Sequence, residues 1–315
     1  MRADVDQFLT CRTSRTTDYD PSTLLAAKRA SGTTVSVVLP ARDEEGTVGP
    51  LVETLLRAWT REVPLVDELV VMDSNSTDDT TSVAVAAGAR VVSVADVLPH
   101  LGSVPGKGEA LWKSLAVTTG ELVVFLDADL VDMDPGFVVG LLGPLLTDPA
   151  VGFVKGFYDR PLATTEGLVP TGGGRVTELL ARPLLNALWP ELAGVVQPLG
   201  GEYAGRRSLL EQVPFVSGYG VEFGLLVDLT RLAGIGCLAQ VDLGVRRHGH
   251  QTDEALGRMA GQILQTALTR LPGHLQATDE LLQFVRTGTD VEAVGWDVSV
   301  SERPPMAQVL AGSGR

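Results

Sequence analysis

Carboxylates that follow directly after apolar runs are the first residues in this chain that could do chemistry. Asp127 and Asp129 come after Leu122–Leu126, and Asp73 comes after Leu69–Met72. Apolar runs of this length are typical of buried strands. Mg²⁺ prefers oxygen ligands and usually takes one or two carboxylates together with phosphate oxygens. Two aspartates at a strand end are often ordinary polar residues, but this pattern also fits a cation that holds a nucleotide diphosphate.

Two glycine-flanked segments carry cations that could bind an anionic substrate. Lys107 lies between two glycines at the start of a predicted helix, and Thr171–Gly174 precedes a second predicted helix that begins with Arg175 and Thr177. Backbone N–H groups at a helix start, together with a cationic side chain, can form an anion site. The alternatives are a solvated loop lysine in the first segment and a flexible connection before a capped helix in the second.

His248 lies in a late loop, directly after Arg246 and Arg247, and follows a predicted strand at residues 238–245. A lone histidine is more often a hydrogen-bonded structural residue than a metal ligand. Two preceding arginines in an acidic protein instead favour an anion or metal–phosphate site. Imidazole suits Mn²⁺ less well than carboxylate does, although mixed sites occur.

The elements that must position these residues alternate regularly from residue 34 onward. Strands are predicted at 35–39, 69–72, 90–94 and 122–126, and helices at 47–59, 76–87 and 109–118. This alternation indicates βαβ units and a largely parallel sheet. Ligands of such sheets bind beyond the carboxyl ends of the strands. We therefore expect the loop at 40–46, Asp73–Ser76 and Asp127–Asp129 to converge in space.

After Asp129 the alternation changes. Helices are predicted at 137–146, 175–188, 220–232 and 254–284, and strands at 151–158 and 238–245. Residues 1–33 are polar and offer one short helix, at 21–30, and we expect disorder at 1–20 and 300–315. We divide the chain into an N-terminal extension (1–30), a nucleotide-sugar-binding half (31–135), an acceptor-binding half of the same domain (136–295) and a flexible tail (296–315).

Composition excludes several classes of protein. The 315 residues are 44% hydrophobic and carry a formal net charge of −14, so they can bury a large core but lack the basic surface of a nucleic-acid-binding protein. Two distant cysteines make neither a disulfide scaffold nor a zinc ribbon. No apolar run is long enough for a membrane span, and the first residues do not resemble a signal peptide. We expect a cytoplasmic protein without integral membrane association.

Two common enzyme classes also lack their sequence signatures. The chain has no GxSxG segment, which disfavours a serine hydrolase of the nucleophile-elbow type. No GxGxxG segment follows the first predicted strand, which disfavours a Rossmann dehydrogenase.

Four segments of the first half resemble the nucleotide-binding half of the GT-A glycosyltransferases: Pro40–Glu45, Asp73–Asp79, Gly106–Gly108 and Asp127–Asp129. Five segments of the second half resemble the glucosyl-3-phosphoglycerate synthases of actinobacteria: Val154–Pro161, Thr171–Leu179, Gln197–Tyr203, Gly218–Glu222 and Gln240–Arg246. The resemblance runs from about residue 20 to about residue 290. It implies an α/β, Rossmann-like GT-A fold with a mostly parallel sheet, flanking helices and a C-terminal acceptor-binding, helical portion.

The resemblance also implies an activity. Members of this family are retaining glucosyltransferases, which move glucose from UDP-glucose to the 2-hydroxyl of 3-phosphoglycerate, the first step toward glucosylglycerate and methylglucose lipopolysaccharide. It further implies dependence on Mg²⁺, or on Mn²⁺ or Co²⁺, and a homodimer.

Position by position, the resemblance assigns roles to individual residues. The uridine diphosphate would be held by Pro40, Ala41, Glu44, Ser74, Lys107 and Asp127. The metal would be bound by Asp129 and His248, the glucose by Glu222 and the backbone near Leu199, and phosphoglycerate by Gly174, Arg175 and Thr177. Arg246 would lie close to the phosphates, so that the residues nearest the chemistry are Glu222, Asp129 and Arg246.

Two departures from the family pattern concern the site. His250 stands where an asparagine is expected, and Arg42-Asp43 stands where Leu-Asn is more usual. Three alternatives remain open: a mannosyl-3-phosphoglycerate synthase that uses GDP-mannose, a polyprenyl-phosphate glycosyltransferase, which would need a membrane-facing apolar surface, and a nucleotide-sugar-binding domain without activity.

Overall fold

The structure is a computed structural model that describes residues 2–159, 162–164, 167–169, 174–246, 252–273, 278–287 and 290–312. At its centre is an eight-stranded sheet in the order β1-β11-β6-β9-β5-β2-β3-β4. The strands are β1 (Thr13–Arg15), β2 (Val35–Ala41), β3 (Glu68–Asp73), β4 (Arg90–Ser93), β5 (Leu122–Phe125), β6 (Phe153–Asp159), β9 (Tyr203–Arg206) and β11 (Leu238–Val245). All of them run parallel except β9, which pairs antiparallel with both β5 and β6. The predicted, largely parallel sheet is therefore confirmed.

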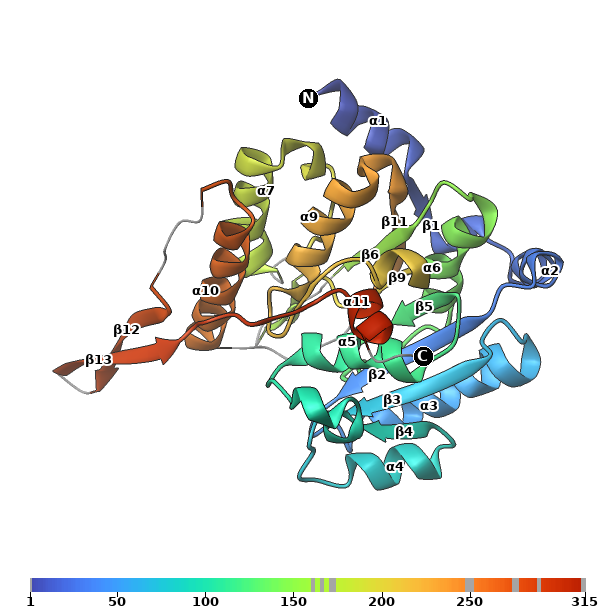
Figure 1. Cartoon of the computed structure of the whole chain (residues 1–315), viewed down its shortest axis with the longest axis horizontal. Helices are drawn as coiled ribbons and strands as arrows, with labels where there is room; N and C mark the ends of the chain where they lie inside the picture. Colours follow the sequence, from blue (N-terminus) through green and yellow to red (C-terminus); the bar gives the residue numbers. More distant parts are fainter. Residues whose placement is uncertain are drawn as a thin grey trace.

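Two layers of helices bury the faces of this sheet, as Figure 1 shows. One face is covered by α2 (Pro21–Ser31), α3 (Val48–Leu56), α4 (Thr80–Ala86) and α6 (Gly136–Thr147). The other is covered by α5 (Lys107–Val117), α7 (Arg182–Leu188), α9 (Val221–Ala233) and α10 (Asp253–Thr269). Because the central strands are covered on both sides, they are nearly continuous apolar runs, and this is why the sequence pattern located β2, β3 and β5 correctly.

The remaining described elements between the main helices and strands are short. They are η1 (Thr16–Asp18), η2 (Arg57–Glu62), η3 (Val94–Asp96), η4 (Pro99–Leu101), β7 (Leu162–Thr164), β8 (Gly167–Val169), η5 (Thr177–Ala181), η6 (Pro190–Leu192), α8 (Arg207–Leu210), β10 (Phe215–Val216) and η7 (Ile235–Cys237). In the described part of the chain, no helix is long and apolar enough to cross a membrane.

Both ends of the chain differ from the expected disorder. The first residues form α1 (Ala3–Cys11), which buries Val5 and Phe8, and β1 extends the central sheet by pairing with β11. Near the other end, β14 (Glu302–Arg303) pairs with β10, and α11 (Met306–Gly312) follows. These segments are too short to show a clear period in the sequence, and β1 and β14 are ordered by pairing with distant strands.

The predicted helix at 254–284 is wrong beyond α10. Leu271 is followed by Pro272 and Gly273, and Gly273 has a φ of 94°, a conformation that ends a helix. The chain then forms a hairpin of β12 (Glu280–Thr287) and β13 (Asp290–Asp297), which projects from the body at the left of Figure 1.

Candidate active site

Five charged side chains meet at the carboxyl edge of the sheet. Asp127 and Asp129 follow β5, Arg246 follows β11, Lys107 begins α5, and Glu222 lies in the first turn of α9. We refer to these five residues as the charged cluster. Residues far apart in the sequence meet here because parallel strands end at the same edge of their sheet. The predicted convergence therefore extends to the second half of the chain.

Lys107 joins two carboxylates from different parts of the chain. Its Nζ donates to Asp127 Oδ1 at 2.5 Å and to Glu222 Oε1 at 2.9 Å. Burial opposes the charged form of Lys107, but the two carboxylates outweigh it and raise the pKa of Lys107 well above its ordinary value. The lysine is therefore a fixed positive charge beside the end of β5.

The glycines around Lys107 serve close packing. A Cβ on Gly108 would lie 1.7 Å from the carbonyl oxygen of Val216, and one on Gly106 would lie 2.2 Å from that of Ser217. The N–H of Gly108 donates to the Ser217 oxygen at 2.9 Å. The sequence suggested that such N–H groups would be free to bind an anion, but the N–H of Gly108 is not free. The glycines instead bring the start of α5 against the segment that leads into α9.

Arg246 binds both aspartates of the charged cluster. Its Nη2 lies 3.0 Å from Asp127 Oδ2 and 2.7 Å from Asp129 Oδ1. Although burial favours the neutral acid, Lys107 and Arg246 together hold the pKa of Asp127 well below its ordinary value. Asp127 is thus held between two cations, whereas the Asp129 side chain is 46% exposed and is the more accessible carboxylate.

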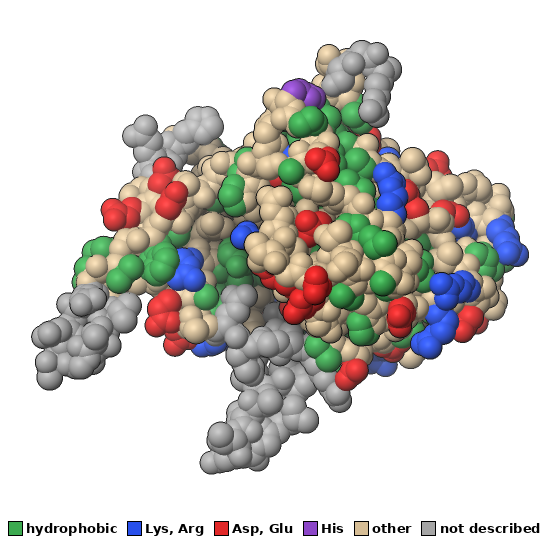
Figure 2. All heavy atoms as spheres, turned by 90° about the horizontal axis from the view of Figure 1, so that it is seen from below, with side chains coloured by type: hydrophobic (Ala, Val, Ile, Leu, Met, Phe, Trp, Pro, Cys, Tyr) green, Lys and Arg blue, Asp and Glu red, His purple; other side chains and the backbone are tan. Residues whose placement is uncertain are grey.

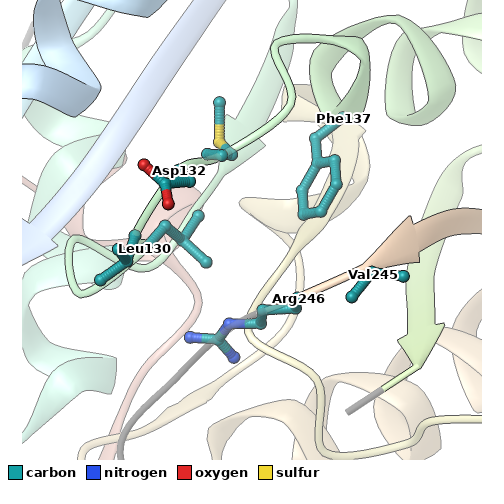
Figure 3. A pocket seen from close by; sticks show the side chains of 7 residues that line it. Leu130, Asp132, Phe137, Val245 and Arg246 are labelled. Carbon is teal, nitrogen blue, oxygen red and sulfur yellow. The ribbon is translucent and has the colours of Figure 1, made fainter. Parts of the chain in front are cut away.

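A cavity of about 320 Å³ opens beside Arg246. It is lined by Leu130, Val131, Asp132, Met133, Phe137, Val245 and Arg246. Figure 3 shows the elements around this space: Leu130 and Asp132 lie on the loop after β5, Phe137 lies on α6, and Val245 and Arg246 lie at the end of β11. The guanidinium therefore lies at the boundary between the charged cluster and a space large enough for a small ligand.

The loop after β2 is tied to the loop after β3. The N–H of Ser74 donates to the Ala41 oxygen at 2.9 Å, and the N–H of Glu44 donates to Thr80 Oγ1 at 2.7 Å. Burial, together with nearby Asp129 and Asp127, raises the pKa of Glu44. The predicted nucleotide-binding residues at the ends of β2 and β3 thus lie on the same edge of the sheet as the charged cluster. They are Pro40, Ala41, Glu44 and Ser74.

Asp43 explains one departure from the family pattern. Its φ is 57°, and its Oδ1 accepts from the N–H of Thr77 at 2.7 Å. Asparagine and aspartate adopt this left-handed conformation more readily than other non-glycine residues. An aspartate can therefore replace an asparagine at this position without changing the path of the loop.

The predicted acceptor residues lie at the start of a helix on the second half of the chain. Gly174 has a φ of 85°, and its carbonyl oxygen accepts from the N–H of Glu178. Thr177 is buried. Arg175 is exposed and pairs with Asp253 at the start of α10. The described part of the chain contains no hydrogen bond from Gly174 or Thr177 to the charged cluster. Thr171–Gly173 lies outside the described residues.

The predicted metal ligands can be compared with the structure only in part. His248 and His250 lie outside the described residues, and within those residues no three His, Cys, Asp or Glu side chains are grouped to hold an ion. Asp129 offers a half-exposed carboxylate of the hard-oxygen type that Mg²⁺ and Mn²⁺ prefer. This donor fits an ion that takes its remaining ligands from phosphate oxygens.

Sequence reasoning assigned no role to the residues that support the cluster from β6 and from the start of β9: Lys155, Tyr158, Glu202 and Tyr203. Lys155 is buried, donates to the carbonyl of Gly200, and lies with its Nζ 4.6 Å from the centre of the Tyr203 ring. Gly200 follows Leu199, a half-buried residue of the predicted sugar site. The signal that could have found them is a lysine within an otherwise apolar strand, since a buried lysine needs a partner.

Lys155 should make stability depend on pH. Burial lowers its pKa to about 7, whereas a lysine in an unfolded chain titrates near 10.4. Between these values the unfolded chain binds one more proton, so the free energy of unfolding should rise with pH, by up to about 1.4 kcal/mol per unit. In Lys155→Met this rise should be flatter, measured by urea unfolding between about pH 7 and 10. An unchanged slope would show that the buried amine does not titrate there.

Comparisons with known proteins place the chain in a family. Residues 36–218 match the family model described as glycosyl transferase family 2. The chain is 54% identical over 283 residues to glucosyl-3-phosphoglycerate synthase of Mycolicibacterium smegmatis, which covers 90% of this chain and 91% of that protein.

Two solved structures are similar over nearly the whole chain. One is glucosyl-3-phosphoglycerate synthase from Mycobacterium tuberculosis in complex with Mn²⁺, uridine-diphosphate-glucose and phosphoglyceric acid, at 48% identity and a TM-score of 0.82, covering 92% of this chain and 95% of that one. The other is mannosyl-3-phosphoglycerate synthase from Rubrobacter xylanophilus, at 38% identity and a TM-score of 0.89, covering 98% of both chains. The family model and the extent of these similarities show that the chain belongs to glycosyl transferase family 2, within the group of the glucosyl-3-phosphoglycerate synthases.

Proposed function

We propose that this protein is a metal-dependent retaining glucosyltransferase, which transfers glucose from UDP-glucose to the 2-hydroxyl of 3-phosphoglycerate and releases UDP. The observation that carries the proposal is the charged cluster, in which Lys107 and Arg246 converge on the two aspartates at the end of β5. A relative of 48% identity binds Mn²⁺, UDP-glucose and phosphoglyceric acid, which supports the same ligands here.

The two cations would act on the leaving group. Breaking the bond between glucose and the diphosphate places negative charge on the diphosphate oxygens. Lys107 and Arg246 are held in place before the reaction by Asp127, so they can stabilise that charge with little rearrangement. Asp129, with His248 as a further proposed ligand, would hold Mg²⁺, Mn²⁺ or Co²⁺, which when bound neutralises part of the diphosphate charge.

Glu222 would orient the glucose and would not form a covalent adduct. It is 7% exposed, and its Oε1 accepts from Lys107 at 2.9 Å. The ion pair with Lys107 stabilises the negative charge of this carboxylate and so makes it a weaker nucleophile. We infer that the acceptor hydroxyl attacks from the face that the diphosphate leaves, with the diphosphate taking the proton, which preserves the anomeric configuration. Pro40, Ala41, Glu44 and Ser74 would hold the nucleotide, and Gly174, Arg175 and Thr177 would hold phosphoglycerate.

A donor screen tests the proposed function. Purified protein with Mg²⁺ and 3-phosphoglycerate should release nucleotide diphosphate from UDP-glucose faster than from GDP-mannose, and Asp129→Ala should abolish the release. The GDP-mannose arm is needed because the mannosyl enzyme of Rubrobacter xylanophilus shares the fold over 98% of both chains. Faster release from GDP-mannose would assign the mannosyl activity, and no release from either donor would contradict the acceptor assignment. The mass of the enzyme should stay unchanged during turnover, since a glucosyl adduct on Glu222 would contradict its orienting role.

The polyprenyl-phosphate alternative is disfavoured by the extent of the similarity. The synthase of Mycolicibacterium smegmatis matches the acceptor-binding half of this chain as well as the nucleotide-binding half, over 90% of its residues. An acceptor other than phosphoglycerate would be expected to change the second half most.

We also propose a cytoplasmic homodimer. Cys11 and Cys237 are both free thiols, which suits a reducing compartment. Leu282 and Phe284 are 53% and 68% exposed on the projecting hairpin, and a second subunit could cover them. Figure 2 shows further hydrophobic side chains, among charged ones, at the left of the molecule. Light scattering on the purified protein should give the mass of two chains, and the mass of one chain would contradict the dimer.

A further inference from the structure

A buried carboxylate, Glu202, lies behind Arg246. Glu202 has no exposed surface, and its Oε1 lies 3.4 Å from Arg246 Nη1. Its other oxygen, Oε2, accepts from the hydroxyl of Tyr158 at 2.5 Å, and the same hydroxyl accepts from Arg246 Nη1 at 2.9 Å. Arg246 therefore uses Nη2 for the aspartates of the charged cluster and Nη1 for Glu202 and Tyr158.

The segment around Glu202 is built to hold these partners. Gln197 binds both backbone groups of Tyr158, since its Oε1 accepts from the N–H at 3.2 Å and its Nε2 donates to the oxygen at 2.7 Å. A Cβ on Gly201 would lie 2.1 Å from Asp127 Oδ2, so only glycine leaves room for that carboxylate. One short segment, Gln197–Glu202, thus sets the positions of Tyr158, Asp127 and Arg246.

Burying a carboxylate is unfavourable unless a cation or hydrogen-bond donors face it. Among the described residues Arg246 is the cation in ion-pair contact with Glu202. Within the part of the chain that the structure describes, Glu202 Oε1 accepts no hydrogen bond, and its contact with Arg246 is electrostatic. Replacing the pair by apolar residues would avoid this burial, which suggests that the pair has a role other than stability.

We propose that Glu202, together with Tyr158, is a positioning residue for Arg246. On the proposed function, on which this inference rests, a diphosphate competes with Asp127 and Asp129 for the guanidinium. Glu202 and Tyr158 hold Nη1 throughout, so that Nη2 stays at the edge of the sheet and can turn from the aspartates to the diphosphate. Without Glu202, the guanidinium of Arg246 can move away from the edge of the sheet. The site then lacks a positive charge that is already in place when the diphosphate binds.

A double-mutant cycle tests this role. The cycle uses three variants: Glu202→Gln, Arg246→Met and the double variant. Thermal unfolding first shows that each is folded, and kcat/KM for UDP-glucose is then compared with that of the unchanged protein. Glu202→Gln should lower kcat/KM by about 10- to 100-fold, the effect of misplacing a catalytic group. In the Arg246→Met background the same change should have an effect of about twofold or less, because residues that act through one another are not additive. Equal effects in both backgrounds would overturn the proposal.

Two further variants separate positioning from general damage. Asp228→Asn removes the charge from a largely buried ion pair with Arg270, whose Nη2 lies 2.5 Å from Asp228 Oδ2. Neither residue belongs to the charged cluster, so this variant should lower stability without lowering kcat/KM. If Arg246→Met does not fold, Tyr158→Phe replaces it: this variant keeps both charges, and should lower kcat rather than raise the KM for 3-phosphoglycerate.

A crystal structure of Glu202→Gln keeps the inference testable even if the donor screen shows no turnover. The guanidinium of Arg246 should then be displaced from its position beside Tyr158. An undisplaced guanidinium would overturn the positioning role, whereas absent turnover in the unchanged protein would overturn the proposed function alone.

Discussion

Replacing Lys107 by methionine should lower kcat/KM for UDP-glucose by about 10²- to 10³-fold, the usual effect of removing a group that stabilises charge in the transition state. It should also destabilise the fold by roughly 3 kcal/mol, since it leaves two partly buried carboxylates without their shared cation. Those carboxylates are Asp127 and Glu222, at 2.5 and 2.9 Å from the lysine nitrogen. Steady-state kinetics and urea unfolding measure the two effects separately.

Lys28→Met is the matched control for this prediction. Lys28 is 7% exposed and pairs with Asp67 at 2.8 Å, just before the start of β3 and therefore at the opposite edge of the sheet. Asp67 is 43% exposed, so water screens its charge and this variant should lose less stability than Lys107→Met. Its kcat/KM should stay within about twofold, because the pair lies at the opposite edge of the sheet. A Lys107→Met variant that turns over normally would show that the lysine is structural.

Among the described glycines, Gly108 is the one at which an added methyl group should have the largest effect. The new Cβ would lie 1.7 Å from the oxygen of Val216, a backbone atom that cannot rotate away. To accommodate it, α5 must move from the Val216–Gly218 segment, which breaks the 2.9 Å bond from the Gly108 N–H to Ser217. We expect a loss of about 3 kcal/mol, the upper end for overpacking, and a fall in UDP affinity because Lys107 begins the displaced helix.

Gly236→Ala provides the comparison. No atom lies within 4 Å of a Cβ at this position, and its φ is not in the left-handed range. The substitution should change the free energy of unfolding by less than about 0.5 kcal/mol, as is usual for surface changes. Urea unfolding and calorimetric titration with UDP and Mn²⁺ give both values, and a Gly108→Ala variant as stable as Gly236→Ala would show that the close approach of backbones is not required.

The sequence was sufficient for the nucleotide-binding half of the sheet. Strands β2, β3 and β5 are buried on both faces, so their apolar runs end sharply where polar loops begin. A parallel sheet brings such ends to a common edge, and for this reason the order of strands and loops along the chain is enough to place Asp127 and Asp129 beside the loop after β2.

The supporting layer could not be predicted from the same signals. Strand β9 runs antiparallel between β5 and β6, and the alternation of strands and helices gives no indication of such an insertion. Glu202 and Tyr158 are 44 positions apart in the sequence and meet only because β6 and β9 are neighbours. The hairpin of β12 and β13 was also not predicted. Each of these strands forms by pairing with the other, and this pairing leaves no signal in the alternation of strands and helices.

Gly106-Lys107-Gly108 shows how a correct motif can be given the wrong physical reason. The glycines suggested exposed N–H groups for an anion, but the structure uses them to bring two backbones together. The lysine is nevertheless at the site, because this close packing fixes the start of α5 beside β5.

The most direct test of the proposed function is to identify the product formed from UDP-glucose and 3-phosphoglycerate. Nuclear magnetic resonance should show a single glucose joined through its anomeric carbon to the 2-oxygen of 3-phosphoglycerate, in the α configuration of the donor, and no product with Asp129→Ala. Free glucose as the only product would contradict transfer to this acceptor, and a β-linked product would contradict attack from the face that the diphosphate leaves.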